Sequence, residues 1–149
     1  MADEKTAIGY AGDLTPQEAW DALKANPRAQ LVDVRTAAEW SFVGQPDLGS
    51  LGRDVCLVEW QTFPTLALNA GFVSQASAAV SKAGADRDAP IFLICRSGGR
   101  SRAAAIAMTQ AGFSHAYNVS GGFEGDLDTS RHRGTQNGWK AANLPWKQT

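Results

Sequence analysis

The amino-acid sequence predicts an α/β fold, in which a central, largely parallel five-stranded sheet carries helices on both faces and so makes three layers. Short apolar runs alternate along the chain with segments of helical periodicity. The run at 91–94 has four large apolar residues directly after a proline, which is typical of a strand buried on both faces. An Ala-rich segment typical of a helix follows it at 103–108. Strands that alternate with helices in this way pair in parallel.

The N-terminal part of the chain predicts a tail, an edge strand, a helix and a second strand. Residues 1–7 are expected to be a flexible tail, and 8–10 a short edge strand. The run 15–18 is Thr-Pro-Gln-Glu, a capping box with proline at the first helical position. We therefore expect a helix that ends near Ala25. The segment 30–34 is short and apolar and predicts the next strand.

The middle of the chain predicts one helical turn, one strand and one longer helix. The turn lies at 37–41 and the strand at 54–58. Apolar residues recur at helical spacing through 72–83, so this segment should bury one face against the sheet. Gly84 follows at the position where glycine commonly ends a helix.

The last third begins with the apolar strand that ends at Cys95. The helix after it should close at Gly112. Beyond that helix we expect, in order, a strand at 115–119, a glycine turn at 121–122, an exposed, mobile loop at 128–138, a helical turn at 139–142 and a packed tail at 144–146.

Composition indicates one ordinary globular domain spanning 1–149. The chain has 44% hydrophobic and 19% charged residues and a net charge of −1, which argues against nucleic acid or a membrane surface as a partner. No apolar run approaches the length of a membrane span, and the first residues do not resemble a signal peptide, so we expect a cytoplasmic protein. We also expect a monomer. The two cysteines, Cys56 and Cys95, cannot form a disulfide framework.

Cys95 lies where a buried strand ends and a helix begins, and in open α/β sheets ligands bind at that edge. Gly98 and Gly99 allow the backbone to curl so that its N–H groups surround the sulfur. The helix N-terminus adds further N–H groups and a positive dipole end, so the loop favours an anion. The candidate anion-binding residues are Arg96, Ser97, Gly98, Gly99, Arg100 and Ser101.

The strength of such contacts predicts a reactive sulfur. Each hydrogen bond to a charged group contributes about 1.5–3 kcal/mol. Two or three N–H contacts would therefore make the thiolate a substantial species at cellular pH. Ser97 and Ser101 offer further hydrogen bonds, although Ser101 is equally suited to be only the helix N-cap.

Three segments together resemble the rhodanese family of sulfurtransferases. They are Leu-Val-Asp-Val-Arg at 31–35, the loop from Cys95 to Arg102, and Val-Ser-Gly-Gly-Phe at 119–123, and they span most of the chain. The resemblance implies a rhodanese-like fold and a persulfide on Cys95, with no other cofactor and no metal. It implies a small anionic donor such as thiosulfate and a thiol or cyanide acceptor. At 43–50 the chain departs from the His-Ile-Pro-Gly-Ala segment frequent in rhodaneses.

Other residues at the carboxyl edge of the sheet are candidates for the pocket wall. Asp33 and Arg35 follow the strand at 30–34, but two such residues more often tie down a neighbouring loop than touch substrate. Trp60 and Phe63 follow the next strand and are equally well explained by core packing. Cys56 is most simply a small core residue, and a resolving thiol is the alternative.

Two other functions remain open at this point. One is a persulfide or sulfide carrier or sensor that serves a partner protein. The other is cysteine-dependent phosphatase or arsenate reductase chemistry, which needs five residues between Cys and Arg, whereas four separate Cys95 from Arg100. A zinc site is not expected, because Cys56, Cys95, His115 and His132 lack the spacing of zinc ligands.

Overall fold

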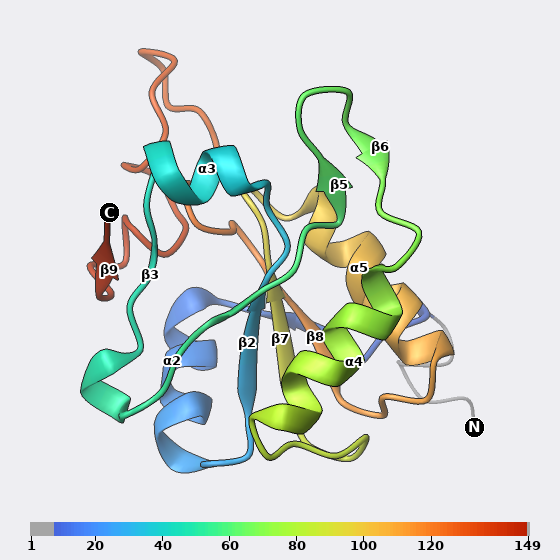
Figure 1. Ribbon diagram of the computed structural model, residues 1–149. Helices are drawn as coiled ribbons and strands as arrows, with labels where there is room; N and C mark the ends of the chain where they lie inside the picture. The colour runs from blue at the N-terminus through green and yellow to red at the C-terminus, as the bar shows by residue number, and fades with distance from the viewer. Residues whose placement is uncertain (1–7, 149) are drawn as a thin grey trace.

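A computed structural model describes residues 8–148, and its centre is a parallel five-stranded sheet (Figure 1). The strand order is β1-β8-β7-β2-β4, with every neighbouring pair parallel. The bounds are β1 Gly12–Leu14, β2 Gln30–Asp33, β4 Cys56–Leu57, β7 Ile91–Ile94 and β8 Ala116–Val119. The expected parallel sheet and its number of strands are confirmed.

Helices cover both faces of this sheet, as predicted. On one face α4 (Phe72–Lys82) and α5 (Gly99–Gln110) pack against alternate residues of the central strands, including Val32 and Leu93. On the other face α2 (Pro16–Ala25) packs with the C-terminal segment over Leu31 and Phe92. The alternation of adjacent residues between two cores explains why these strands are apolar throughout.

The predicted helix boundaries agree closely with the structure. Thr15 caps α2 through a full capping box, in which the Thr15 side chain accepts from Glu18 N–H and the Glu18 side chain accepts from Thr15 N–H. Thr36 makes the same motif with Glu39 at the start of α3 (Ala37–Phe42). α5 starts at Gly99, earlier than its Ala-rich run suggested.

Several strand predictions were wrong in position or length. The edge strand is Gly12–Leu14 and not 8–10. Pairing with β8 begins only at Ala11, whose backbone N–H donates to Ala116 O. The strand predicted at 54–58 is reduced to Cys56–Leu57. Two small antiparallel ribbons were not predicted: β3 (Gln45–Pro46) with β9 (Trp146–Lys147), and β5 (Gln61–Thr62) with β6 (Ala67–Leu68).

The C-terminal segment wraps one face of the sheet. Residues 128–138 form neither helix nor strand and are mostly exposed. The segment 139–142 is a turn, not a turn of helix. Trp139 is fully buried, and its indole N–H donates to Pro145 O at 2.7 Å. The predicted tail at 1–7 lies outside the described residues.

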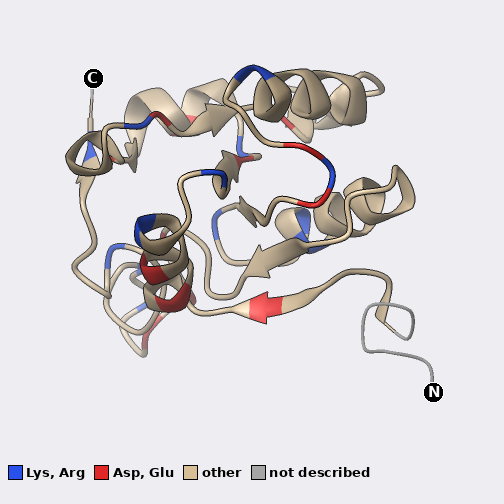
Figure 2. Ribbon diagram, turned by 90° about the horizontal axis from the view of Figure 1, so that it is seen from below, with Lys and Arg blue, Asp and Glu red and all other residues tan. Residues whose placement is uncertain are grey.

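The carboxyl ends of the strands face α3 and the β5–β6 ribbon, which rise above that edge of the sheet in Figure 1. Basic and acidic residues are interspersed over the ribbon in Figure 2, in keeping with a net charge of −1. Within residues 8–148 the helices are too short or too polar for one to cross a membrane. Cys95 directly follows β7 at this same edge of the sheet.

Candidate active site

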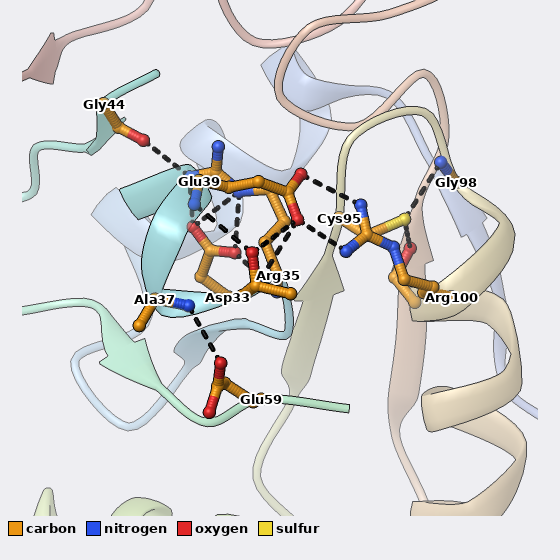
Figure 3. A network of polar contacts seen from close by, with 11 residues as sticks. Asp33, Arg35, Ala37, Glu39, Gly44, Glu59, Cys95, Gly98 and Arg100 are labelled. Atoms are coloured by element: carbon orange, nitrogen blue, oxygen red, sulfur yellow. Dashed lines mark hydrogen bonds and ion pairs between the residues drawn. The ribbon is translucent and has the colours of Figure 1, made fainter. Parts of the chain in front are cut away.

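The site is a tight turn between β7 and α5 that holds Cys95 (Figure 3). Gly98 is the N-cap of α5 and has φ +119°, a left-handed value that favours glycine. Ser101 lies inside the first turn of the helix, so its predicted alternative role as the N-cap is wrong. Because of this turn, the cysteine sulfur lies beside the positive end of a helix of 12 residues.

Two hydrogen-bonding groups reach the sulfur among the described residues. Gly98 N–H donates to Cys95 Sγ at 3.1 Å, and Ser101 Oγ lies 3.2 Å from Sγ. The expected ring of amides from 96–101 is thus reduced to one amide and one hydroxyl. Cys95 is 1% exposed, so the sulfur is held beneath the loop.

The glycine turn after β8 supports the loop from behind. Phe123 N–H donates to Cys95 O at 2.7 Å, and Glu124 N–H donates to Arg96 O at 3.0 Å. A Cβ on Gly122 would lie 2.5 Å from Cys95 O, and Gly122 has φ +62°. Only glycine allows this close approach, which explains why the segment 119–123 accompanies the cysteine loop.

Arg100 is paired with Glu39 of α3. The guanidinium donates through Nη1 to Oε1 at 2.7 Å and through Nη2 to Oε2 at 3.0 Å, and both side chains are about one-fifth exposed. The hydrogen bond with Glu39 is the main cause that raises the pKa of Arg100, against burial. Burial acts to raise the pKa of Glu39, but Arg100 and the Thr36 donors outweigh it and the pKa is lowered.

The remaining loop residues face solvent or a neighbouring hollow. Arg96 is exposed. Ser97, Gly98 and Gly99 line a hollow of about 530 Å³ on the β1 side of the loop. The other residues of that hollow are Ile8, Tyr10, Asp13, Arg102, Asn118, Ser120 and Gly121. The six predicted anion-binding residues are therefore close in space but do not all point at the sulfur.

Asp33 and Arg35 form a fully buried ion pair. Arg35 Nη2 donates to Asp33 Oδ2 at 2.6 Å and to Gly44 O at 2.8 Å, and both side chains are 0% exposed. The guanidinium also lies 4.2 Å from the centre of the Phe123 ring. The pair ties the 43–44 loop to the sheet, so neither residue presents a charge to a substrate.

The two aromatic candidates for the pocket wall are separated. Trp60 packs edge-on against Phe72 with ring centres 5.0 Å apart, and thus belongs to the core. Phe63 lies in the β5–β6 turn and is 64% exposed. Cys56 is partly buried in β4, and burial, followed by the Asp54 charge, raises the pKa of its thiol against the effect of Arg53.

Sequence reasoning missed the partners that set the state of the loop. Glu39 was not among the predicted site residues, and its contact with Arg100 spans 61 residues of chain. Asn118 and Asp13 adjoin the site because β1 pairs with β8 in a register that sets them side by side. Within residues 8–148 no group of three His, Cys, Asp or Glu side chains could hold a metal ion.

The chain is similar to several known proteins. Residues 11–149 match the family model described as the STR4 middle domain. The crystal structure of Rv0390 from M. tuberculosis has a TM-score of 0.85 and 51% identity, covering 94% of this chain and 99% of that one. An uncharacterized protein of Rickettsia conorii, RC0915, is 40% identical over 87% of this chain and 92% of its own length. The probable adenylyltransferase/sulfurtransferase MoeZ of Mycobacterium tuberculosis is 29% identical over 82% of this chain and 26% of MoeZ.

Proposed function

The chain belongs to the STR4 middle domain family and has a rhodanese-like fold, and from this we propose that it is a sulfurtransferase carrying a sulfane sulfur as a persulfide on Cys95. The observation that carries the proposal is a free cysteine at the carboxyl end of a parallel strand, with its sulfur against an amide at a helix N-terminus. The sulfurtransferase name of MoeZ supports the same chemistry.

The first half-reaction loads the cysteine. The Cys95 thiol loses its proton to solvent, and the thiolate attacks the outer sulfur of thiosulfate. A bond forms between Sγ and that sulfur, the sulfur–sulfur bond of thiosulfate breaks, and sulfite leaves with its electron pair. The total charge of −3 is unchanged, since a thiolate and a dianion become a persulfide anion and a dianion.

The second half-reaction unloads it. Cyanide or an acceptor thiolate attacks the outer sulfur of the persulfide and forms a bond to it. The sulfur–sulfur bond of the persulfide breaks, Cys95 Sγ keeps the electron pair as a thiolate, and the product is thiocyanate or a new persulfide. The loop stabilises both anions of the cycle because Gly98 N–H and the α5 N-terminus present positive charge at the sulfur.

Access to the sulfur requires a local rearrangement, because Cys95 is 1% exposed. Arg100 is a cation that interacts electrostatically with Cys95, and Glu39 occupies both of its terminal nitrogens. An incoming dianion exchanges places with the Glu39 carboxylate on Arg100. The free energy of thiosulfate binding therefore includes the cost of breaking the Arg100–Glu39 ion pair.

The burial of Cys95 and the engagement of Arg100 also favour a second candidate, a carrier loaded by the persulfide of a partner protein. Docking of a protein supplies more binding energy for opening the loop than a small anion does. In that case loading from a protein persulfide is fast while turnover with free thiosulfate is slow.

The experiment compares three proteins in thiosulfate:cyanide transfer: the parent chain, Cys95→Ser and Cys56→Ser. We expect the Cys95→Ser protein to lose transfer while its thermal unfolding is unchanged, and the Cys56→Ser protein to keep it. Thiosulfate is then replaced by a persulfidated protein donor, which separates the enzyme from the carrier. Transfer retained by the Cys95→Ser protein excludes both versions of the proposal.

A further inference from the structure

We propose that Asp13 and Asn118 are positioning residues that turn the hydroxyl hydrogen of Ser101 away from Cys95, so that the resting protein holds Cys95 as a neutral thiol. This inference deepens the proposed function, because it assigns the control of the nucleophile at the same site. It concerns residues of β1, β8 and α5 that meet behind the cysteine loop.

The chain of contacts begins at Asp13. Asn118 Nδ2 donates to Asp13 Oδ1 at 3.0 Å, and the Tyr10 hydroxyl donates to the same oxygen at 3.0 Å. An ionised carboxylate only accepts hydrogen bonds. The Asn118 amide is therefore oriented with its NH₂ group toward Asp13, and its carbonyl oxygen has to face the other way.

The Asn118 carbonyl oxygen faces Ser101. Ser101 Oγ lies 2.6 Å from Asn118 Oδ1, which is short for a hydroxyl donor and an amide acceptor. Asn118 Oδ1 has no hydrogen to give, so the single hydroxyl hydrogen of Ser101 lies on this line. The contact between Ser101 Oγ and Cys95 Sγ, at 3.2 Å, is then left without that hydrogen.

The lone pair of Ser101 Oγ therefore faces the sulfur, and the group that satisfies it is the S–H of Cys95. A thiolate in the same place would meet two unfavourable alternatives. Either it faces an oxygen lone pair at 3.2 Å, or Ser101 turns its hydrogen to the sulfur and leaves two acceptor oxygens 2.6 Å apart. Both Ser101 and Asn118 are buried, so water does not readily repair either arrangement.

Other groups around the sulfur act on the same equilibrium. Gly98 N–H favours the anion, and so do the cations Arg96 in the loop and Arg100 on α5. The carboxylates of the surroundings disfavour it; they are Asp13 on β1, Asp33 on β2 and Glu39 on α3. The orientation of Ser101 sets which of these opposing influences prevails in the resting state.

The test measures how fast Cys95 is alkylated by iodoacetamide as a function of pH, in a Cys56→Ser background that leaves one thiol. Ser101→Ala removes the oxygen that stabilises the S–H group, and Asn118→Ala releases the Ser101 hydrogen for the sulfur; neither changes the charge. We expect both midpoints to move to lower pH. The shift should be about half to one unit for Ser101→Ala, which loses a neutral hydrogen bond, and about one unit or more for Asn118→Ala, which gains a hydrogen bond to a charged sulfur. A rise or no change in the Ser101→Ala protein means that Ser101 donates to a thiolate, and overturns the proposal.

Asp13→Asn tests the far end of the chain of contacts. The new amide allows Asn118 to turn over, so the midpoint should again fall, and a fall should persist at high salt, where the loss of the Asp13 charge contributes least. Tyr10→Phe is the matched control, since it removes a donor to Asp13 and leaves Asn118 oriented; its midpoint should not move. A fall in the Asp13→Asn protein that vanishes at high salt, or an equal fall in the Tyr10→Phe protein, overturns the role of Asp13.

An infrared measurement gives a readout that does not depend on these variants. The resting protein at neutral pH should show an S–H stretching band that is missing from the Cys95→Ser protein, and absence of that band overturns the proposal. Alkylation does not require sulfur transfer, so the two proposals fail separately. A protein that transfers no sulfur but shows the expected midpoints refutes the proposed function alone.

Discussion

Replacing Glu39 by glutamine should make the protein use thiosulfate more readily at low concentration. The substitution removes the carboxylate that occupies Arg100. It retains the start of α3, because glutamine at this position can still accept from Thr36 N–H, as Glu39 does. Thiosulfate then competes for Arg100 with a neutral amide instead of a carboxylate.

The size of the effect follows from the geometry of the pair. Two charge-assisted hydrogen bonds at 2.7 and 3.0 Å hold the side chains, which remain 22% and 21% exposed. At an effective dielectric constant near 20, unit charges about 4 Å apart attract by about 4 kcal/mol. Hydration of the separated groups leaves a net value nearer 1.4 kcal/mol. That energy corresponds to about a tenfold lower half-saturating concentration of thiosulfate.

The assay is steady-state transfer from thiosulfate to cyanide over a range of donor concentrations. Glu59→Gln is the matched control, because Glu59 accepts from Ala37 N–H at the same helix at 2.9 Å and does not contact Arg100. Its half-saturating concentration should stay within about twofold of the parent value. The reasoning is refuted if Glu39→Gln leaves that concentration unchanged or raises it, or if Glu59→Gln lowers it to the same extent.

Three further predictions concern the surroundings of the site. Cys56→Ser should keep turnover within about twofold, because a thiol with a raised pKa is a poor nucleophile at neutral pH; a large loss would identify a resolving thiol. Arg35→Met should lower the free energy of unfolding in urea by about 3–5 kcal/mol, since it leaves Asp33 buried without its partner; a loss below about 1 kcal/mol would contradict the buried pair. Because the pKa of Glu39 is lowered in the folded protein, its pairing stabilises above the ordinary glutamate value of about 4.3 and is lost as the pH falls through the lowered value. The difference in unfolding free energy between the parent and Glu39→Gln should therefore be present at pH 7 and shrink in acid, and a pH-independent difference would count against this origin.

Local signals in the sequence predicted the main elements well. The Thr15 capping box located the start of α2 to the residue, and the apolar run 91–94 located β7 and the cysteine after it. These features depend on neighbours a few positions apart. The two-residue strands, such as Gln61–Thr62, carry no comparable periodicity, so they could not be predicted.

The sequence located the loop that holds Cys95 but not the partners of its side chains. Arg100 was expected to be available for an anion, and the structure pairs it with Glu39 because α3 lies over the edge of the sheet near the start of α5. Ser101 was expected to donate to the sulfur, and Asn118 competes for its hydrogen. Both differences arise from contacts between distant segments, which no local pattern encodes.

The central claim is that Cys95 carries the transferred sulfur. Its most direct test is the intact mass of the Cys56→Ser protein after exposure to thiosulfate and removal of excess donor, followed by peptide mapping. The account predicts one added sulfur atom, located on Cys95 and removed by cyanide. An unchanged mass with thiosulfate and with a persulfidated protein donor, or an added sulfur on any other residue, would contradict it.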